Sequence, residues 1–422
     1  MTMRVQQLSL LSERLKPIIE GEWDFNGADT TYLTHGIHPY PARMIPQIAN
    51  RLITRYSNDG NLIFDPFCGS GTVLCESVLN NRDAVGIDLN PLARLIARVK
   101  TTAIPPKELG DLVNKTIELV KSPDRPNRLR DSIQIGVDVG FWFKPKVARD
   151  LQFVSSVLES FSDHAQFHDL LKVAFSVTVR EVSNTRNGEF KLYRIPEEKL
   201  KNHDPDAKDV FLRHLHAISK RCADFHEHMR GISAKAQVFE SDARVFGLDE
   251  SADLIVTSPP YGDSRTTVAY GQFSRLASEW LGFKEAGSLD RRSLGGMTNS
   301  RKIPELKTLQ ETLARVESKD KERVKDVSNF FVDMYCCMER MHSSLRTGGK
   351  AAIVIGDRTV KGFRIPNGDI IIEMGKDVGF SLASRFNRKI PSKTMPSKNS
   401  PSNVTGETGS TILGEHIIVL EK

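Results

Sequence analysis

Cysteine is scarce in this chain, and the cysteines present follow no metal-binding or disulfide spacing. The 422 residues contain five cysteines, an odd number without a C-x-x-C pair. The sequence therefore predicts neither a disulfide framework nor a zinc site, and no metal is expected. The cysteines, which we expect to be reduced thiols, are Cys68, Cys75, Cys222, Cys336 and Cys337.

Long apolar runs and targeting signals are also missing. No stretch approaches the roughly 18 apolar residues that a membrane-spanning helix needs, and nothing resembles a secretory signal peptide. We therefore expect a soluble cytoplasmic protein with no membrane partner. The net charge of +6 and the isoelectric point of about 8.9 are compatible with a polyanionic partner. Many globular proteins share this balance without binding nucleic acid, so charge alone decides nothing.

The apolar runs that do occur are short and bounded by turn residues, which predicts buried strands. Helical patterns separate several of them. The predicted strands are 62–66, 83–88, 237–241, 253–257, 350–356 and 416–421, and the predicted helices are 72–80, 91–100 and 329–345. Strands that alternate with helices indicate an α/β fold with a doubly wound, mostly parallel sheet.

Two long segments interrupt this alternation, residues 101–236 and 262–328. The first reads largely as helices with clustered positive charge and is too long for a loop, so it predicts a helical inserted module. In the second, the charged run 319–325 predicts a solvated helix face. Residues 391–409 are rich in Ser, Pro, Thr and Asn and predict a mobile loop. One α/β domain is left, made of residues 1–100, 237–261 and 329–422.

The sharpest local signal is the segment FDPFCGSGT at residues 64–72, where a strand ends in Asp65 and a turn with Gly69 and Gly71 opens a helix. Glycines let the backbone turn sharply and approach a ligand, and the helix N-terminus favours an anionic group. The segment lacks the G-x-G-x-x-G of dinucleotide sites and the Lys-Ser/Thr of a P-loop, which disfavours both ligand classes. In many proteins such a turn only packs a helix on a strand.

Asp88 strengthens the ligand-binding interpretation of that turn. It ends the next predicted strand, about 20 residues after the glycines. At this spacing an acidic side chain can bind the two ribose hydroxyls of an adenosine cofactor.

A second signal is the segment TSPPY at residues 257–261, which follows another buried strand. Pro259 and Pro260 restrict the backbone and donate no N–H, so neighbouring carbonyls remain free as acceptors. With the Ser258 hydroxyl and the Tyr261 ring, the segment offers acceptors for an amino group beside a surface for a planar base. A rigid turn with a packed tyrosine is the purely structural alternative.

Together the two segments resemble the cofactor and catalytic motifs of the bacterial site-specific DNA amino-methyltransferases. The segment HPYPAR at residues 38–43 resembles the stretch before the cofactor motif in one subgroup, and Asp242-Ala243 resembles the position that reads the adenine. The resemblance covers both ends of the chain and implies a seven-stranded Rossmann-like methyltransferase sheet that binds S-adenosyl-L-methionine. It implies that the cofactor is bound by His38, Tyr40, Pro41, Asp65, Phe67, Gly69, Gly71, Thr72, Asp88, Asn90, Asp242, Ala243 and Thr257.

The resemblance also implies catalytic roles for Ser258, Pro259, Pro260 and Tyr261. The target base is flipped out of double-stranded DNA into the pocket. There Ser258 and a proline carbonyl accept hydrogen bonds from its amino group, and Tyr261 stacks on the ring. Transfer is direct, with positioning and electrostatics supplying most of the catalysis. A C5-cytosine enzyme needs a cysteine nucleophile after proline, and no Pro-Cys dipeptide occurs, so Cys68 is interpreted as a small loop residue.

Within the family, serine before Pro-Pro-Tyr resembles the N4-cytosine enzymes, with N6-adenine as the alternative target. Two other classes stay open: a methyltransferase for RNA or a protein amide, and a catalytically idle DNA-binding module. Residues 101–236 are assigned to target recognition by elimination, and residues 262–328 to further DNA contact. The sequence leaves open whether a cognate restriction endonuclease is a partner, and it does not determine the oligomeric state or the recognised DNA sequence.

Overall fold

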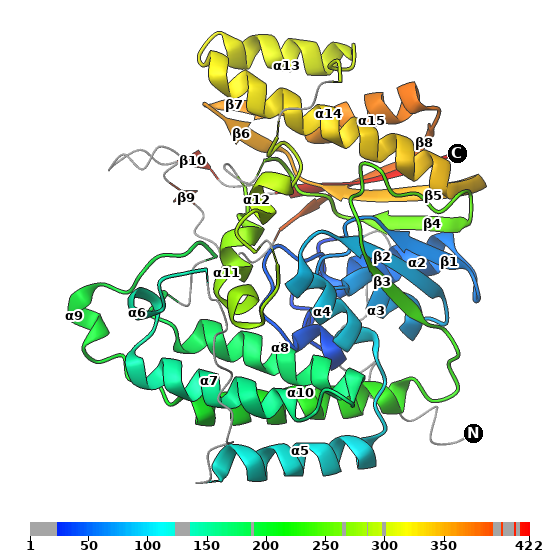
Figure 1. Ribbon diagram of the computed structural model, residues 1–422. Coiled ribbons are helices and arrows are strands. Elements are labelled where there is room, and N and C mark those ends of the chain that lie inside the picture. The colour runs from blue at the N-terminus through cyan, green and yellow to red at the C-terminus, as the bar shows by residue number, and fades with distance from the viewer. Residues whose placement is uncertain are drawn as a thin grey trace.

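The computed structural model describes residues 23–122, 136–186, 190–263, 267–284, 286–297, 301–390, 398–399, 409–410 and 414–422. Within them, seven strands form a central sheet in the order β3-β2-β1-β4-β5-β11-β8 (Figure 1). The neighbours from β3 to β5 are parallel, and β11 is antiparallel to both β5 and β8. The strands are β1 (Leu62–Asp65), β2 (Asp83–Asp88), β3 (Ala236–Glu240), β4 (Ala252–Thr257), β5 (Leu345–Ile355), β8 (Ser381–Lys389) and β11 (Gly414–Glu421).

This sheet confirms the predicted α/β class and the mostly parallel, doubly wound arrangement. All six predicted strands are present, with boundaries shifted by a few residues. The exposed edge strand β8 was not predicted, because it lacks the apolar run by which the buried strands were found. The small antiparallel pairs were not predicted either; they are β6 (Arg358–Val360) with β7 (Phe363–Ile365) and β9 (Lys398–Asn399) with β10 (Gly409–Ser410).

Helices cover both faces of the sheet, and the side chains of each strand alternate between the two layers. In β4, Leu254 and Val256 pack with α2 (Pro46–Tyr56) on one face. Ile255 packs on the other face with α14 (Lys321–Ser344) and α15 (Asn367–Val378). Because successive strand residues point to opposite faces, a strand buried on both sides is apolar throughout. This burial explains the short apolar runs in the sequence.

The helices that follow β1 and β2 begin where the sequence predicted them. They are α3 (Thr72–Leu79) and α4 (Pro91–Thr101). Asn90 caps α4 by accepting a hydrogen bond from the backbone N–H of Leu92 at 3.1 Å, and Pro91 occupies the first helical position. The cap holds the end of β2 next to the start of α4.

Residues 101–236 are largely helical, as predicted. They form α5 (Pro106–Lys121), α6 (Val139–Trp142), α7 (Pro145–Glu159), α8 (Ala165–Val182), α9 (Glu197–Leu200) and α10 (Ala207–His228). Phe175 of α8 and Phe211 of α10 belong to one hydrophobic cluster, which also contains Ile96 of α4 and Leu276 of α11 (Tyr270–Trp280). The helical region thus shares its core with helices beside the sheet (Figure 1).

Residues 262–328 contribute α11, α12 (Leu289–Arg292), α13 (Lys307–Glu317) and the start of α14. The predicted solvated helix face is confirmed, because Lys321, Glu322 and Lys325 are exposed on the first turns of α14. Asp320 caps this helix by accepting hydrogen bonds from the backbone N–H groups of Glu322 and Arg323. The predicted mobile loop at 391–409 lies mostly outside the described residues. Within the described ranges, no helix is both long and apolar enough to cross a membrane.

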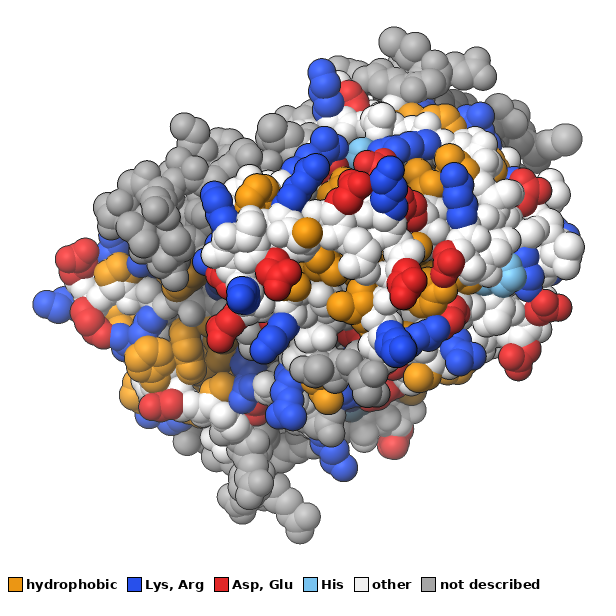
Figure 2. Space-filling model, turned by 90° about the horizontal axis from the view of Figure 1, so that it is seen from above, with side chains coloured by type: hydrophobic (Ala, Val, Ile, Leu, Met, Phe, Trp, Pro, Cys, Tyr) orange, Lys and Arg blue, Asp and Glu red, His pale blue; other side chains and the backbone are white. Residues whose placement is uncertain are grey.

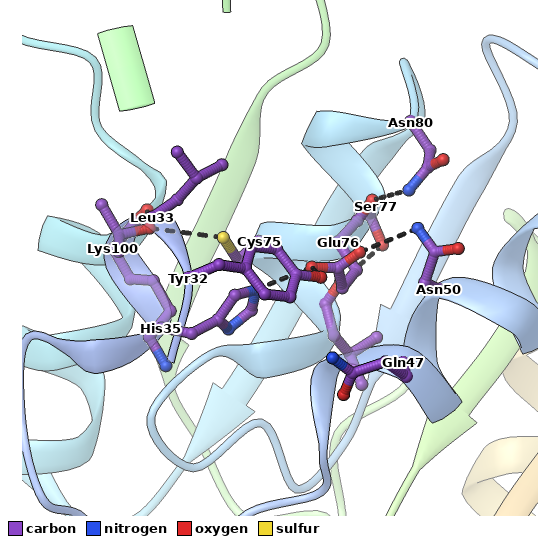
Figure 3. Close-up of polar contacts among 12 residues, drawn as sticks. Tyr32, Leu33, His35, Gln47, Asn50, Cys75, Glu76, Ser77, Asn80 and Lys100 are labelled. Atoms are coloured by element: carbon purple, nitrogen blue, oxygen red, sulfur yellow. Dashed lines mark hydrogen bonds and ion pairs between the residues drawn. The ribbon is translucent and has the colours of Figure 1, made fainter. Parts of the chain in front are cut away.

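A buried polar cluster fixes the short 3-10 helix η1 (Leu33–Gly36) against α3. Glu76 is 1% exposed and accepts hydrogen bonds from Tyr32 Oη at 2.6 Å and from Asn50 Nδ2 at 2.9 Å. His35 Nε2 lies 2.7 Å from the same carboxylate. Figure 3 shows these three side chains converging on Glu76, with Tyr32 just before η1, His35 in η1 and Asn50 in α2. The cluster therefore positions the segment that leads into residues 38–43.

Lys100 lies fully buried at the end of α4, beside this cluster. Its Nζ atom is 3.5 Å from the hydroxyl of Ser70, in the turn between β1 and α3. Burial, reinforced by the nearby positive charge of Arg43, lowers the pKa of Lys100 to about 7. The folded protein therefore holds a lysine that sheds its proton well below the usual range.

We expect Lys100→Met to stabilise the protein most at and below about pH 7, and progressively less as the pH rises toward 10.5. The unfolded chain protonates this lysine below about 10.5 but the folded protein only below about 7, so wild-type stability falls as the pH falls through that window. The loss is at most about 1.4 kcal/mol per pH unit. Urea denaturation at several pH values measures the difference between the two proteins. The exposed Lys107 provides the control Lys107→Met, and a pH-independent difference for Lys100→Met would contradict the expectation.

Candidate active site

The carboxyl ends of β1, β2 and β4 meet at one edge of the sheet, where the strand order reverses between β1 and β4. Ligands of open α/β sheets bind at such switch points. A cavity that is open to solvent lies here. The predicted site residues that line it are Tyr40, Pro41, Asp65, Phe67, Gly69, Thr72, Asp88, Asn90, Asp242, Ala243, Ser258 and Pro260. The predicted residues outside the lining are His38, Gly71, Thr257, Pro259 and Tyr261.

Asp65 joins the ends of β1 and β4. Its Oδ1 atom accepts hydrogen bonds from Thr257 Oγ1 at 2.6 Å and from the backbone N–H of Phe67 at 3.1 Å. Burial raises the pKa of Asp65 to about 7, although both hydrogen bonds favour the ionised form. Thr257 thus acts on the site through Asp65, from a position outside the cavity.

The two glycines of the turn after β1 have different surroundings. Gly69 has a φ of +49°, and a Cβ atom added there would lie 3.8 Å from the nearest atom, in the Tyr40 ring, so the glycine leaves the cavity open. Gly71 has a φ of +77°, and a Cβ there would lie 2.7 Å from the Cβ of Ala97 in α4. Gly69 therefore provides ligand space, whereas Gly71 allows α3 and α4 to pack closely.

Asp88 faces the same cavity from the end of β2. Its Oδ2 accepts from the backbone N–H of Gly69 at 2.9 Å, and its Oδ1 accepts from that of Asn90 at 2.7 Å. Burial raises the pKa of Asp88, while these two hydrogen bonds oppose the shift. Each carboxylate oxygen has a further lone pair. Asp88 can therefore shape the glycine turn and still accept from a ligand hydroxyl.

The segment 38–43 approaches the cavity through its tyrosine. The Tyr40 ring stacks on Tyr270 of α11 at 5.9 Å, and its hydroxyl lies 2.9 Å from Asn90 Nδ2. His38 is buried with its ring edge-on to Phe273, 6.1 Å away. The structure therefore places Tyr40 in the cavity lining and His38 behind it. Cys68 is also buried, and burial raises the pKa of its thiol, as expected for a small loop residue rather than a nucleophile.

Asp242 lines the cavity after β3 and is paired with Arg244. Arg244 Nη2 lies 2.6 Å from Asp242 Oδ2, and Arg244 Nη1 lies 3.0 Å from the buried Asp333 of α14. Arg244 also donates to the backbone carbonyl of Arg292, next to Ser293. The guanidinium thereby holds the Asp242 loop, α14 and the end of α12 together.

The catalytic segment 257–261 is held by residues that sequence reasoning did not identify. Asn367, fully buried, donates from Nδ2 to the carbonyl of Tyr261 at 2.9 Å. Glu415 Oε1 accepts from the Tyr261 hydroxyl at 2.7 Å. Both partners lie more than 100 positions away along the chain, so no local pattern could indicate them.

The residues after Tyr261 are fixed by a buried ion pair between Asp263 and Arg358 of β6, with a contact of 2.8 Å. The guanidinium lies against Gly262, where an added Cβ would come within 2.1 Å of Arg358 Nη1. A larger residue at position 262 would therefore have to displace the Arg358 guanidinium from its ion pair with Asp263.

Residues 262–328 also contribute to the cavity wall, through Tyr270, Leu289, Ser293 and Leu294. These positions belong to α11, α12 and the turn after α12, and carry no recognisable motif. No cluster of His, Cys, Asp and Glu suited to a metal occurs among the residues that the structure describes.

Fold and site together define an S-adenosylmethionine-dependent methyltransferase, with a cofactor turn after β1 and a Ser-Pro-Pro-Tyr segment after β4. A family model described as a DNA methylase matches residues 4–98. The Type II methyltransferase M.MvaI of Kocuria varians is 34% identical, and the alignment covers 94% of this chain and 93% of that protein. The chain therefore belongs to the DNA amino-methyltransferase family, and S-adenosyl-L-methionine is its cofactor.

Two further similarities are more limited. The Type II methyltransferase M.MjaII of Methanocaldococcus jannaschii is 36% identical over 24% of this chain and 21% of that protein. A solved TehB-like methyltransferase from Corynebacterium glutamicum aligns at 12% identity over 89% of this chain and 86% of that one, with a TM-score of 0.28.

We expect Asp88→Ala to weaken binding of S-adenosylmethionine by about 1–3 kcal/mol, because the carboxylate loses its hydrogen bonds to the ribose hydroxyls. Isothermal titration calorimetry on the folded variant measures the change. Asp83→Ala, at the opposite end of the same strand, is the matched control. If Asp88→Ala binds S-adenosylmethionine with unchanged affinity, the role of Asp88 is only to shape the glycine turn.

Proposed function

We propose that this protein transfers a methyl group from S-adenosyl-L-methionine to the exocyclic N4 of cytosine in duplex DNA, after flipping the base. The observation that carries the proposal is that Ser258 and Pro260 line the same cavity as Gly69, Asp88 and Asp242. Acceptors for an amino group and the residues suited to an adenosine cofactor thus face one space, which is what direct transfer between two bound partners requires.

The proposed cofactor contacts follow from the groups that face this space. Asp88 would hold the ribose hydroxyls, Asp242 with Ala243 would contact the adenine, and the open space at Gly69 would let the backbone approach the ligand. The bound cofactor supplies the electrophilic methyl group. His38, Gly71 and Thr257 would act indirectly, by packing or through Asp65.

The proposed chemistry at the base depends on the Ser258 hydroxyl and a proline carbonyl. Both would accept hydrogen bonds from the amino group and so turn its lone pair away from the ring and toward the methyl group. The Tyr261 ring, which does not line the ligand-free cavity, would provide a stacking surface once the flipped base enters. Pro259 and Pro260 keep the backbone rigid, and because the site is held in advance, little reorganisation is needed during transfer.

The choice of N4-cytosine rests on serine as the residue before Pro-Pro-Tyr. N6-adenine is the alternative, because its amino group would meet the same acceptors. Sequencing of DNA from cells that express the protein, by a method sensitive to both modifications, identifies the base and its sequence context in one experiment.

We further propose that residues 1–100, 237–261 and 329–422 form the catalytic domain and that residues 101–236 recognise DNA. Residues 190–192 lie near α11, because Phe190 packs edge-on to Phe273 at 6.2 Å and Leu192 N–H lies 3.4 Å from Gln272 Oε1. Tyr270 of the same helix lines the cavity. Residues 262–328, which contain α11 and α12, would then contact DNA next to the flipped base.

The face formed by α13, α14 and α15 carries side chains of both charges. Figure 2 shows the molecule from the side of α13, α14 and α15, where basic and acidic side chains are interspersed. A phosphate backbone is best matched by clustered positive charge, so this face is a weaker candidate for DNA. Action on DNA implies a cytoplasmic protein, and the Type II names of the relatives make a cognate restriction endonuclease a reasonable partner to test.

We expect Ser258→Ala to slow methyl transfer by raising its barrier by about 2–4 kcal/mol, with little change in DNA affinity. The lost acceptor matters most as the amine attacks. Tyr261→Ala should instead weaken capture of the flipped base by about 1–3 kcal/mol, the scale of base stacking on an aromatic side chain. Single-turnover kinetics with 2-aminopurine beside the target base separates the two steps. If Ser258→Ala transfers the methyl group at the wild-type rate, the backbone carbonyls alone must orient the amine.

We expect DNA affinity to depend on the exposed residues Arg186 and Lys199, which border a second cavity in the helical region. If each contacts one phosphate, replacing both by alanine should make the negative slope of log affinity against log salt shallower by about 1.8. Fluorescence anisotropy over a range of salt concentrations measures the slope. The control replaces two exposed lysines of α5, Lys107 and Lys121, and an equal loss in both variants would argue against a specific role for Arg186 and Lys199.

A further inference from the structure

The Tyr261 hydroxyl lies between a carboxylate and the Ser258 hydroxyl. It donates to Glu415 Oε1 of β11 at 2.7 Å, and its oxygen lies 3.5 Å from Ser258 Oγ. The second distance is at the outer limit for two hydroxyls, and contacts in ligand-free active sites commonly tighten when substrate binds. The three groups form a hydrogen-bond chain from β11 to the wall of the cavity, where Ser258 lies.

The direction of this chain follows from the chemistry of its members. An ionised carboxylate only accepts hydrogen bonds, so Tyr261 must donate its single hydroxyl proton to Glu415. The Tyr261 oxygen can then only accept from Ser258. The Ser258 proton is thereby directed away from the cavity, which leaves the Ser258 lone pairs for a donor within it.

Arg388 of β8 fixes the other end of the chain. This buried guanidinium lies 2.9 Å from Glu415 Oε2, with Glu415 14% exposed at its side chain. Because arginine only donates, Oε2 must remain an acceptor. A glutamine at position 415 would therefore direct its carbonyl oxygen to Arg388 and its NH₂ group to Tyr261.

We propose that Glu415 is a positioning residue that sets the direction of the hydrogen-bond chain and so makes Ser258 an acceptor for the amino group of the target base. The inference rests on the proposed function, in which Ser258 accepts from that amino group. With glutamine at position 415 the chain reverses: the amide donates to Tyr261, Tyr261 donates to Ser258, and the Ser258 proton points at the amine.

The first test is Glu415→Gln, which keeps the shape of the side chain and removes the charge. We expect the single-turnover methyl-transfer rate to fall about 100-fold, the lower end of the range for a proton-positioning group, with DNA and S-adenosylmethionine affinities unchanged. Glu421→Gln on the same strand is the control, because Glu421 pairs with Lys350 at 3.2 Å and lies away from the site. Wild-type transfer by Glu415→Gln would overturn the proposal.

The second test uses Tyr261→Phe, which keeps the ring and removes the link in the chain. The single variant should transfer methyl more slowly without losing DNA affinity. In the double variant, Glu415→Gln should add no further loss, because the chain is already broken. If Glu415 had only a structural role, the rate losses of Glu415→Gln and Tyr261→Phe would multiply in the double variant. This result would overturn the proposal.

Ser258→Ala separates this inference from the proposed function. If Ser258→Ala is slow and Glu415→Gln is as fast as wild type, the direction of the chain has no effect and only the inference fails. If Ser258→Ala is as fast as wild type, the proposed role of Ser258 fails, and the inference fails with it. Calorimetric binding of S-adenosylmethionine establishes that each variant is folded, and Tyr261→Phe tests the chain without disturbing the Arg388 ion pair.

Discussion

The hydrogen bond between Thr257 and Asp65 joins the two halves of the active site. It spans 2.6 Å between the carboxyl ends of β4 and β1 and is buried. These strands are neighbours in the sheet, at the point where the strand order reverses. The cofactor turn and the catalytic segment therefore start from one place. The site requires a carboxyl group to be buried here, and burial raises the pKa of Asp65 to about 7. The position of Ser258 relative to Gly69 depends on this junction.

The catalytic segment is stabilised mainly by elements far from it in the sequence. Asn367 holds the carbonyl of Tyr261, Glu415 holds its hydroxyl, and Arg358 pairs with Asp263. Groups in a functional site act best when their own positions are fixed in advance by packing and hydrogen bonds. In this protein β6, α15 and β11 have that function, which gives the closing part of the chain a direct role in the geometry of the site.

The helical region and the catalytic sheet are mechanically connected. One hydrophobic cluster contains Phe175 and Phe211 of the helical region together with Ile96 of α4 and Leu276 of α11. Asn90, the cap of α4, contacts Tyr40 in the cavity lining, and α11 carries Tyr270. The helical region and the cavity wall are therefore joined through α4 and α11, which contribute to both.

The sequence by itself determined the strands buried on both faces, the helices after β1 and β2, and the two motifs at the switch point. These features are encoded locally: burial on both faces makes a strand apolar throughout, and a sharp turn needs glycine. The exposed strand β8 left no such signal. Only the tertiary structure decided which motif residues face the cavity, that Gly71 packs on Ala97 while Gly69 leaves space, and that Glu415 contacts Tyr261. Such contacts depend on how distant elements pack, and a hydrogen-bond partner 154 residues away leaves no pattern in the local sequence.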